Sequence, residues 1–314
     1  MRRRLFAILA AACLCLMTYG LARAAESVPV WVALSESVGP HVEAAAALRA
    51  DVDQALPGRV EWRIAHWSQF SSPNPEPHWV VAVGTAALKG LQDVFARDTR
   101  PPALLALLVP RLAFERIADP ARLRTGSVSA VFLDQPAGRQ LDLIRLALPD
   151  AHRFGILITG ESKAYAPALE AAGRERGLQM VSSLVEQGGL YPALQSLLPD
   201  VDVLLALPDP MVFNSQTAGS ILTAAYRRQV PLAGFSPAYV KAGALLALYS
   251  TPAQVGRRGG ELLRQALAAK PQPLPQPHSP REFTVEVNQN VARSLGLALD
   301  EARLGEQLRQ KDRP

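Results

Sequence analysis

Short apolar runs alternate with longer segments of helical period along most of this chain, and this alternation restricts the fold more than any other feature. The runs lie at residues 30–34, 60–65, 79–83, 104–109, 128–133, 154–159, 179–184, 203–207, 230–234 and 244–249. Between them apolar residues recur at helical spacing, as at Leu141, Ile144 and Leu148. Most runs are continuously apolar, which is typical of strands covered by helices on both faces. The pattern predicts an α/β fold with parallel sheets.

Chain length and breaks in the pattern predict two lobes joined by three crossings. About 290 residues after position 24 exceed what one small core organises. The breaks lie at residues 118–127, 250–252 and 270–280, the last of which holds five prolines. We therefore expect residues 28–126 plus 252–272 in the first lobe, and 127–251 plus 281–297 in the second. A strand at 283–287 and a short helix at 290–296 should pack back on the body, and 298–314 should form a polar tail that is frayed from about Leu304.

Residues 1–24 have the pattern of an export signal. Three arginines precede an apolar run at 5–21, and Ala22, Arg23 and Ala24 form an A-x-A cleavage site. We expect cleavage near Ala24 and a periplasmic product. An uncleaved membrane anchor and a lipid on Cys13 remain alternatives. Both cysteines, Cys13 and Cys15, lie in this segment, so the mature chain cannot depend on disulfides and needs an ordinary packed core.

The net charge gives no support for a nucleic-acid partner. Removal of residues 1–24 takes away four arginines, so 33 basic residues become 29 against 28 acidic ones, and the net charge falls from +5 to +1. Nucleic-acid binding needs a clustered basic surface, which this balance does not suggest. A soluble monomer that acts on a small molecule is the expectation.

Searches for catalytic and cofactor motifs return little. The five histidines never come within metal-ligand spacing of one another, so no metal site is expected. Gly84 and Thr85 follow a strand, but no further glycines complete a dinucleotide fingerprint, and no cofactor is expected. Ser236 lies in a Gly-Phe-Ser-Pro-Ala turn in which Pro237 cannot supply an oxyanion-hole amide. The chain is therefore predicted not to be an enzyme.

Polar and aromatic residues stand where the predicted strands end, and ligands of open parallel sheets collect there. Helix starts at these positions could hold a carboxylate, the acidic residues could receive an ammonium group, and the rings could stack on a ligand. Each residue has an alternative role as a helix cap or as part of the core. The candidate ligand-binding residues are Ser35, Glu36, Thr85, Asp134, Glu161, Asp209, Phe213, Asn214, Ser236, Tyr239 and Tyr249.

The segment Pro-Leu-Ala-Gly-Phe-Ser-Pro-Ala-Tyr-Val-Lys-Ala-Gly-Ala-Leu at 231–245 resembles the signature of periplasmic solute-binding proteins of the tryptophan/tyrosine-type ABC-transporter family. Leu-Pro-Asp-Pro at 207–210 with Phe213 and Asn214, Gly-Arg-Arg-Gly at 256–259, and residues 287–297 are similar in order and spacing. The resemblance extends from about Val128 to Leu297. It implies a type I periplasmic-binding-protein fold, in which two flavodoxin-like lobes close around a small molecule.

This resemblance also implies a function. Proteins of this family deliver solutes to inner-membrane ABC permeases, and some bind an aromatic amino acid. The first half departs from the family pattern, since Val-Pro-Arg-Leu-Ala at 109–113 replaces a loop with glycine and aspartate, so no ligand is transferred. We expect a periplasmic receptor for a small organic solute, such as an amino acid, in which changes at Asp209 or Asn214 weaken binding. The alternatives are a ligand sensor that docks on a membrane signalling or outer-membrane uptake partner, and a periplasmic hydrolase that uses Ser236.

Overall fold

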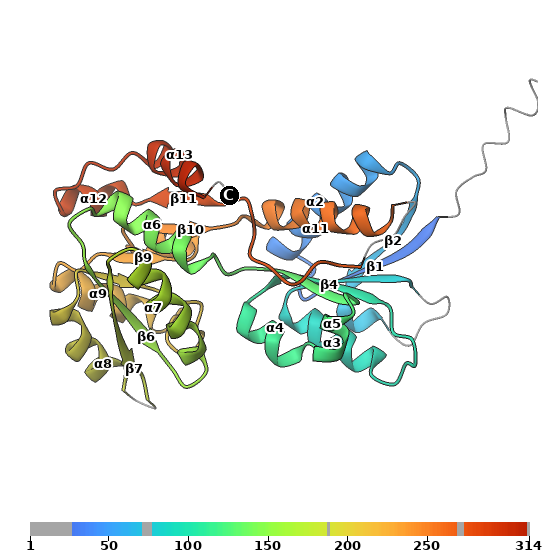
Figure 1. The fold of residues 1–314 in the computed structure, drawn as a ribbon, viewed down its shortest axis with the longest axis horizontal. Coiled ribbons are helices and arrows are strands. Elements are labelled where there is room, and N and C mark those ends of the chain that lie inside the picture. Colours follow the sequence, from blue (N-terminus) through green and yellow to red (C-terminus); the bar gives the residue numbers. More distant parts are fainter. Residues whose placement is uncertain (1–26, 71–76, 187–188, 269–272, 313–314) are drawn as a thin grey trace, which may run out of the picture.

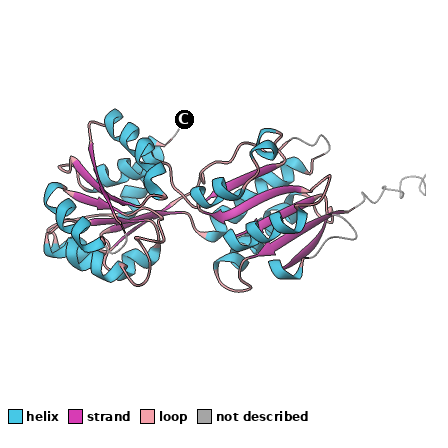
Figure 2. Ribbon diagram, turned by 90° about the horizontal axis from the view of Figure 1, so that it is seen from below, coloured by secondary structure: helices cyan, strands magenta, loops and turns pink. Residues whose placement is uncertain are grey.

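The computed structural model describes residues 27–70, 77–186, 189–268 and 273–312, and residues 1–24 with the predicted export signal lie outside them. Two α/β lobes lie side by side (Figure 1), and each has a sheet with helices on both of its faces (Figure 2). The predicted fold class is confirmed. No helix among the described residues combines the length and apolar character that a membrane span requires.

The first lobe is built on a parallel sheet with strand order β2-β1-β3-β4-β5. Its strands are β1 (Val28–Leu34), β2 (Val60–His66), β3 (Trp79–Val83), β4 (Ala103–Val109) and β5 (Val128–Phe132). Its helices are α2 (Pro40–Ala55), η1 (Trp67–Gln69), α3 (Thr85–Phe95), α4 (Arg111–Ile117), α5 (Pro120–Arg124) and α11 (Pro252–Ala266). Alternate strand residues face two cores: α2 and α11 cover one face of the sheet, and α3 and α4 cover the other.

The second lobe has six strands in the order β11-β10-β9-β8-β6-β7, of which β11 is antiparallel. These strands are β6 (Arg153–Ile158), β7 (Gln179–Leu184), β8 (Val203–Leu205), β9 (Leu232–Gly234), β10 (Leu246–Tyr249) and β11 (Thr284–Val287). One face packs on α6 (Ala137–Ala147), α7 (Ala166–Glu175), α12 (Gln289–Ser294) and α13 (Glu301–Lys311). The other packs on α8 (Leu190–Leu197), η3 (Leu198–Asp200), α9 (Ala218–Arg227) and α10 (Pro237–Ala242), while η2 (Ser162–Tyr165) precedes α7.

The first crossing lies later in the chain than the sequence pattern indicates. Strand β5 pairs with β4 in the first sheet, so the chain leaves this lobe after residue 132 and not within 118–127. The broken pattern at 118–127 is instead the short helix α5, which begins where Asp119 accepts a hydrogen bond from the amide of Ala121 at 2.8 Å. A proline and a cap in sequence therefore mark a helix start here, not a lobe boundary.

The chain end is also different from the polar, frayed tail expected from about Leu304. Residues 301–311 form α13, which begins where the side chain of Asp300 accepts from the amide of Arg303 at 3.0 Å. Leu304 and Leu308 are buried in the core of the second lobe. Two leucines four positions apart form a single apolar stripe, so the polar remainder of this segment is the solvent face of an amphipathic helix.

Three segments connect the lobes, and Figure 1 shows them in green, orange and red. They are residues 133–136 after β5, 250–251 after β10, and a segment that we call the strap, residues 273–283. The strap first follows the free edge of β5, where the amide of His278 donates to the carbonyl of Ala130 at 3.1 Å and the amide of Phe132 donates to the carbonyl of His278 at 3.0 Å. The strap thus extends the first sheet before it enters the second lobe.

Replacement of His278 by glutamine should reduce the acid sensitivity of the fold. Burial lowers the pKa of His278 from its ordinary value of 6.5. The charges of Arg258 and Arg281 act in the same direction, and the hydrogen bond to the carbonyl of Gln276 opposes them. Below pH 6.5 the unfolded chain therefore binds more protons than the folded chain, and stability falls as the pH decreases. Glutamine can still accept from Nε of Arg258, which lies 3.2 Å from Nε2 of His278.

The measurement is urea unfolding at about pH 7 and about pH 5, the range in which histidine titrates. We expect His278→Gln to lose less stability across this range than the unchanged protein. The control is His152→Gln, the same substitution at an exposed position. An identical loss of stability in His278→Gln and the unchanged protein would contradict the prediction that His278 contributes to the acid sensitivity of the fold.

Candidate ligand-binding site

A cavity of about 610 Å³ lies between the two lobes. We call it the cleft. Its walls come from the start of α2 and Pro110 in the first lobe, from loops after β8 and β9 in the second lobe, and from the first two connections. All these segments follow the carboxyl ends of parallel strands, where ligands of such sheets bind. The volume suits a small organic molecule.

Proline is the commonest residue of the cleft. Pro40, Pro237 and Pro252 are the first residues of α2, α10 and α11, where the fixed proline φ favours helix initiation. Pro110 precedes α4 and lies two positions after Leu108, whose positive φ of 54° accompanies a register shift in β4. These local features stop the strands and turn the chain along the cleft. The prolines that line it are Pro40, Pro110, Pro208, Pro210, Pro237 and Pro252.

Aromatic rings form the wall contributed by the second lobe. Phe213 and Phe235 line the cleft, and Tyr239 packs behind them with ring centroids 6.1 Å from Phe213 and 4.9 Å from Phe235. Burial raises the pKa of Tyr239 to about 12, so this ring is a neutral support. The hydroxyl of Tyr249, another residue lining the cleft, donates to Oε2 of Glu286 at 2.7 Å. The arrangement presents apolar ring surface to a ligand.

Asp134 joins elements of both lobes at the edge of the cleft. Its Oδ2 accepts from the amide of Arg111, the first residue of α4, at 2.6 Å, and its Oδ1 accepts from the hydroxyl of Tyr165 in the second lobe. Burial raises the pKa of Asp134, although both hydrogen bonds oppose that change. Both carboxylate oxygens therefore already have protein partners.

A buried arginine ties the connections together. Nη1 of Arg139 donates to Oε1 of Gln135 at 2.7 Å and to the carbonyl of Pro280 at 2.9 Å, and Nη2 donates to Oδ2 of Asp312 at 2.6 Å. Nε2 of Gln135 donates to Oγ of Ser250 at 2.9 Å, and that hydroxyl donates to the carbonyl of Glu282. All three connections and the end of α13 thus share one set of contacts, which we call the hinge network: Gln135, Arg139, Ser250, Asp312 and the carbonyls of Pro280 and Glu282.

Four of the eleven residues predicted from the sequence line the cleft: Asp134, Phe213, Ser236 and Tyr249. The other seven do not, and several of them stabilise local backbone. Asp209 is only 3% exposed and accepts from Oγ1 of Thr159 at 2.8 Å and from the amide of Met211 at 2.9 Å. Oδ1 of Asn214 accepts from backbone amides before α9, and Oγ of Ser35 accepts from the amide of Ala87 at 2.9 Å.

The remaining predicted residues also lie outside the cavity wall. Glu161 pairs with Arg116 of α4 at 2.9 Å across the lobes, on an exposed surface. Glu36 is exposed, Thr85 begins α3, and Tyr239 lies behind the phenylalanine rings. A role of these residues in binding stays a prediction.

The residues that line the cleft without having been predicted from the sequence include Glu43, Gln140 and Phe235. Glu43 follows Pro40 in the first turn of a helix that starts after a strand, and this pattern could have identified it. Phe235 lies beside Ser236 in the turn after β9 and could have been found in the same way. Gln140 lies inside α6, and only the packing of the lobes brings it to the cleft.

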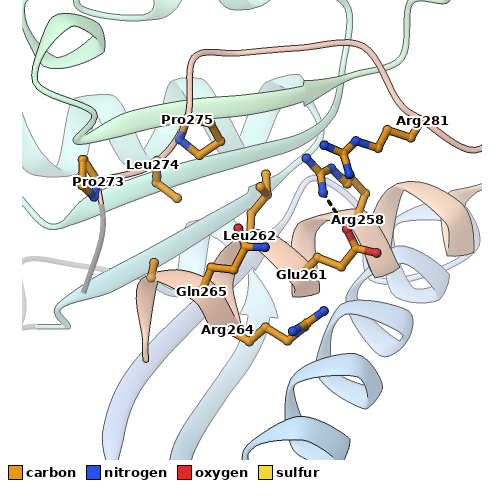
Figure 3. A pocket seen from close by; sticks show the side chains of 10 residues that line it. Arg258, Glu261, Leu262, Arg264, Gln265, Pro273, Leu274, Pro275 and Arg281 are labelled. Atoms are coloured by element: carbon orange, nitrogen blue, oxygen red, sulfur yellow. Dashed lines mark hydrogen bonds and ion pairs between the residues drawn. The ribbon is translucent and has the colours of Figure 1, made fainter. Parts of the chain in front are cut away.

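A second cavity, of about 490 Å³, lies between α11 and the strap (Figure 3). Three arginines line it, and two of them have partners: Arg258 binds Glu261 at 2.6 Å, and Arg264 binds Asp51 at 3.3 Å. Figure 3 shows Arg281 on the same side of the cavity as Arg258. None of these three arginines is among the described residues that line the cleft.

Comparison with protein families gives one match. The family described as ABC transporter substrate binding protein matches residues 104–309. No curated protein matches the sequence.

Solved structures with the same fold cover nearly the whole chain. A ligand-free, open substrate-binding protein from Clostridium difficile has a TM-score of 0.65 at 17% identity, over 87% of this chain and 96% of that one. An ABC domain in complex with L-Trp from Streptococcus pneumoniae has a TM-score of 0.59 at 18% identity, over 89% and 98%. A periplasmic ribose ABC transporter from Conexibacter woesei has a TM-score of 0.56 at 13% identity, over 89% and 98%.

Proposed function

This chain belongs to the family of ABC transporter substrate-binding proteins, and from that membership we propose that it captures a small organic solute in the cleft and delivers it to an inner-membrane ABC permease. One observation supports this most directly: a cavity of about 610 Å³ is lined by both lobes at the carboxyl ends of their strands. A ligand held there contacts both lobes at once. Such contacts stabilise the closed arrangement over the open one.

The proposal includes a location for the protein outside the cytoplasm. Substrate-binding proteins of this family act outside the inner membrane, and the export pattern of residues 1–24 agrees with that location. The protein would act as a monomer, because two lobes of one chain already form the complete cleft.

The cleft offers little for hydrolysis. Ser236 lines it, but the lining residues that the structure describes include no histidine or lysine that could remove the proton of its hydroxyl. Family membership also does not select the solute, since one similar structure is named as a complex with L-Trp and another as a ribose transporter. An amino acid is one candidate.

Replacement of Phe235 by alanine should weaken solute binding about tenfold, since a stacked ring contributes about 1 kcal/mol or more. The solute is first identified by a thermal-shift screen with a library of small metabolites, because a ligand that binds only the folded state raises the melting temperature. Calorimetry then compares the unchanged protein with the variant.

Tyr226→Ala is the matched control, because this ring is 62% exposed on α9 and does not line the cleft. It should leave the affinity unchanged. The proposal is refuted if no solute of the library raises the melting temperature, or if the identified solute binds Phe235→Ala as tightly as the unchanged protein.

A further inference from the structure

The polar side chains of the cleft differ in which of their atoms remain free. Nε2 of Gln135 and Nε2 of Gln140 are both used as donors, the first to Ser250 and the second to the carbonyl of Gln135 at 2.8 Å. The hydroxyls of Ser250 and Tyr249 donate to Glu282 and Glu286. Within the described part of the chain, the side-chain donors that stay without a partner in the cleft are the hydroxyl of Ser236 and the second N–H of each of the Gln135 and Gln140 amide groups.

The charged side-chain group that remains free among the described residues of the cleft is an acceptor. The carboxylate of Glu43 makes no hydrogen bond or ion pair with any described residue, and Oε1 of Gln140 accepts none from them. Asp134 adds a second carboxylate, which already has its two donors. No lysine, arginine or histidine is among the described residues that line the cleft. A ligand that brings N–H donors and positive charge finds partners here, whereas a carboxylate finds few.

The backbone strengthens this bias. Six of the residues that line the cleft are prolines, and none of them has an N–H group to offer a carboxylate, while the carbonyls of Pro110 and Pro210 already accept hydrogen bonds within the protein. At two of the helices that begin at the cleft, α4 and α11, an amide of the first turn already has a side-chain partner, whereas Ser236 makes no such bond at α10. The side chain of Asp134 occupies the first amide of α4, and Thr251 with Gln254 forms a capping box on α11. In α2 the carboxylate of Glu43 lies in the first turn and opposes the positive helix end.

From these observations we propose that the cleft selects an aromatic amine that carries no carboxylate. This inference rests on the proposed function and narrows its solute class. The ring packs against Phe213 and Phe235 of the second lobe, and the ammonium group binds Glu43 of the first lobe. Because ring and ammonium contact different lobes, the whole ligand is held only when the lobes close. An amino acid, which carries a carboxylate beside its ammonium group, binds more weakly.

Calorimetry with matched ligands tests this assignment on the full mature chain. One series is tryptamine, L-tryptophan and indole-3-propionate, and a second is phenethylamine, L-phenylalanine and 3-phenylpropionate, so that ring size is separated from charge. Of tryptamine and phenethylamine, we expect the one with the higher affinity to bind about tenfold or more tightly than the amino acid of the same series. The propionate of that series should bind least. Glu43→Gln should weaken amine binding about tenfold and leave binding of the propionate unchanged or improved. Exposed Glu61 lies on β2 away from the cleft, and Glu61→Gln should change nothing.

Three results would overturn the inference: an amino acid or propionate that binds as well as its amine, amine binding that is unaltered in Glu43→Gln, or no binding by either amine. Failure of the underlying function has a different signature. In that case no solute of the metabolite library, acidic, basic or neutral, would raise the melting temperature. A different library solute that stabilises the protein would keep the receptor function and remove only the amine class.

Discussion

Replacement of Arg139 by alanine is expected to lower the free energy of unfolding by about 3 kcal/mol, because it breaks the hinge network at its centre. The arginine side chain is only 6% exposed and lies with its guanidinium 4.7 Å from the ring centroid of Phe283. Its loss leaves Oε1 of Gln135 and the carbonyl of Pro280 without their donor in a buried position. Unsatisfied buried acceptors and an unpaired carboxylate account for most of the expected cost.

Urea unfolding gives the measurement, and Arg145→Ala on the same helix is the control. The side chain of Arg145 is exposed and donates to the carbonyl of Arg176 at 3.0 Å, so its removal should cost less than about 0.5 kcal/mol. Equal losses in the two variants would show that the hinge network does not stabilise the fold.

Gly256→Ala should destabilise the first lobe by a similar amount, about 3 kcal/mol. Helices α2 and α11 pack closely at this glycine, and a Cβ atom there would lie 2.2 Å from the carbonyl oxygen of Ala44. That oxygen belongs to helix backbone, so relief requires the two helices to move apart. Separation of α2 from α11 would disturb the core that they share beneath the sheet.

The matched control is Gly219→Ala, another helical glycine, where a Cβ atom would meet nothing within 4 Å. Here alanine should raise the free energy of unfolding by about 0.5 kcal/mol through its better helix propensity. Thermal or urea unfolding of both variants checks the pair. A Gly256→Ala protein as stable as the unchanged one would contradict the close approach of α2 and α11.

The alternation of apolar runs and helical segments was sufficient to predict the fold class. All predicted strands are present. Inner strands such as β4 and β5 are buried on both faces and so read as continuous apolar runs, whereas the edge strands β2 and β7 are partly exposed. The sequence pattern could not predict to which of the two sheets β5 belongs, since the local sequence of a parallel strand does not specify its partner strands. The amphipathic helix α13 was missed because two leucines form its whole apolar face.

The site was predicted less well, for a physical reason. Ser35, Asp209 and Asn214 do follow strand ends, but their side chains accept hydrogen bonds from nearby backbone amides. Serine, aspartate and asparagine have the same chemistry in a cap and in a binding site, and only the direction of the side chain separates the two. Glu43 and Gln140 reach the cleft from helices of different lobes, which no local pattern can bring together.

The order in which the elements are synthesised has a consequence for how this protein acquires its structure. Asp51 of α2 and Arg264 of α11 are ion-paired although 213 positions separate them, and Arg139 meets Asp312 across 173 positions. During synthesis neither lobe can complete its fold early, because each lobe contains a segment that is translated late. Folding one unit at a time during translation, the usual route for multidomain chains, is closed to this chain. The nascent polypeptide therefore stays incompletely folded until its last helices emerge.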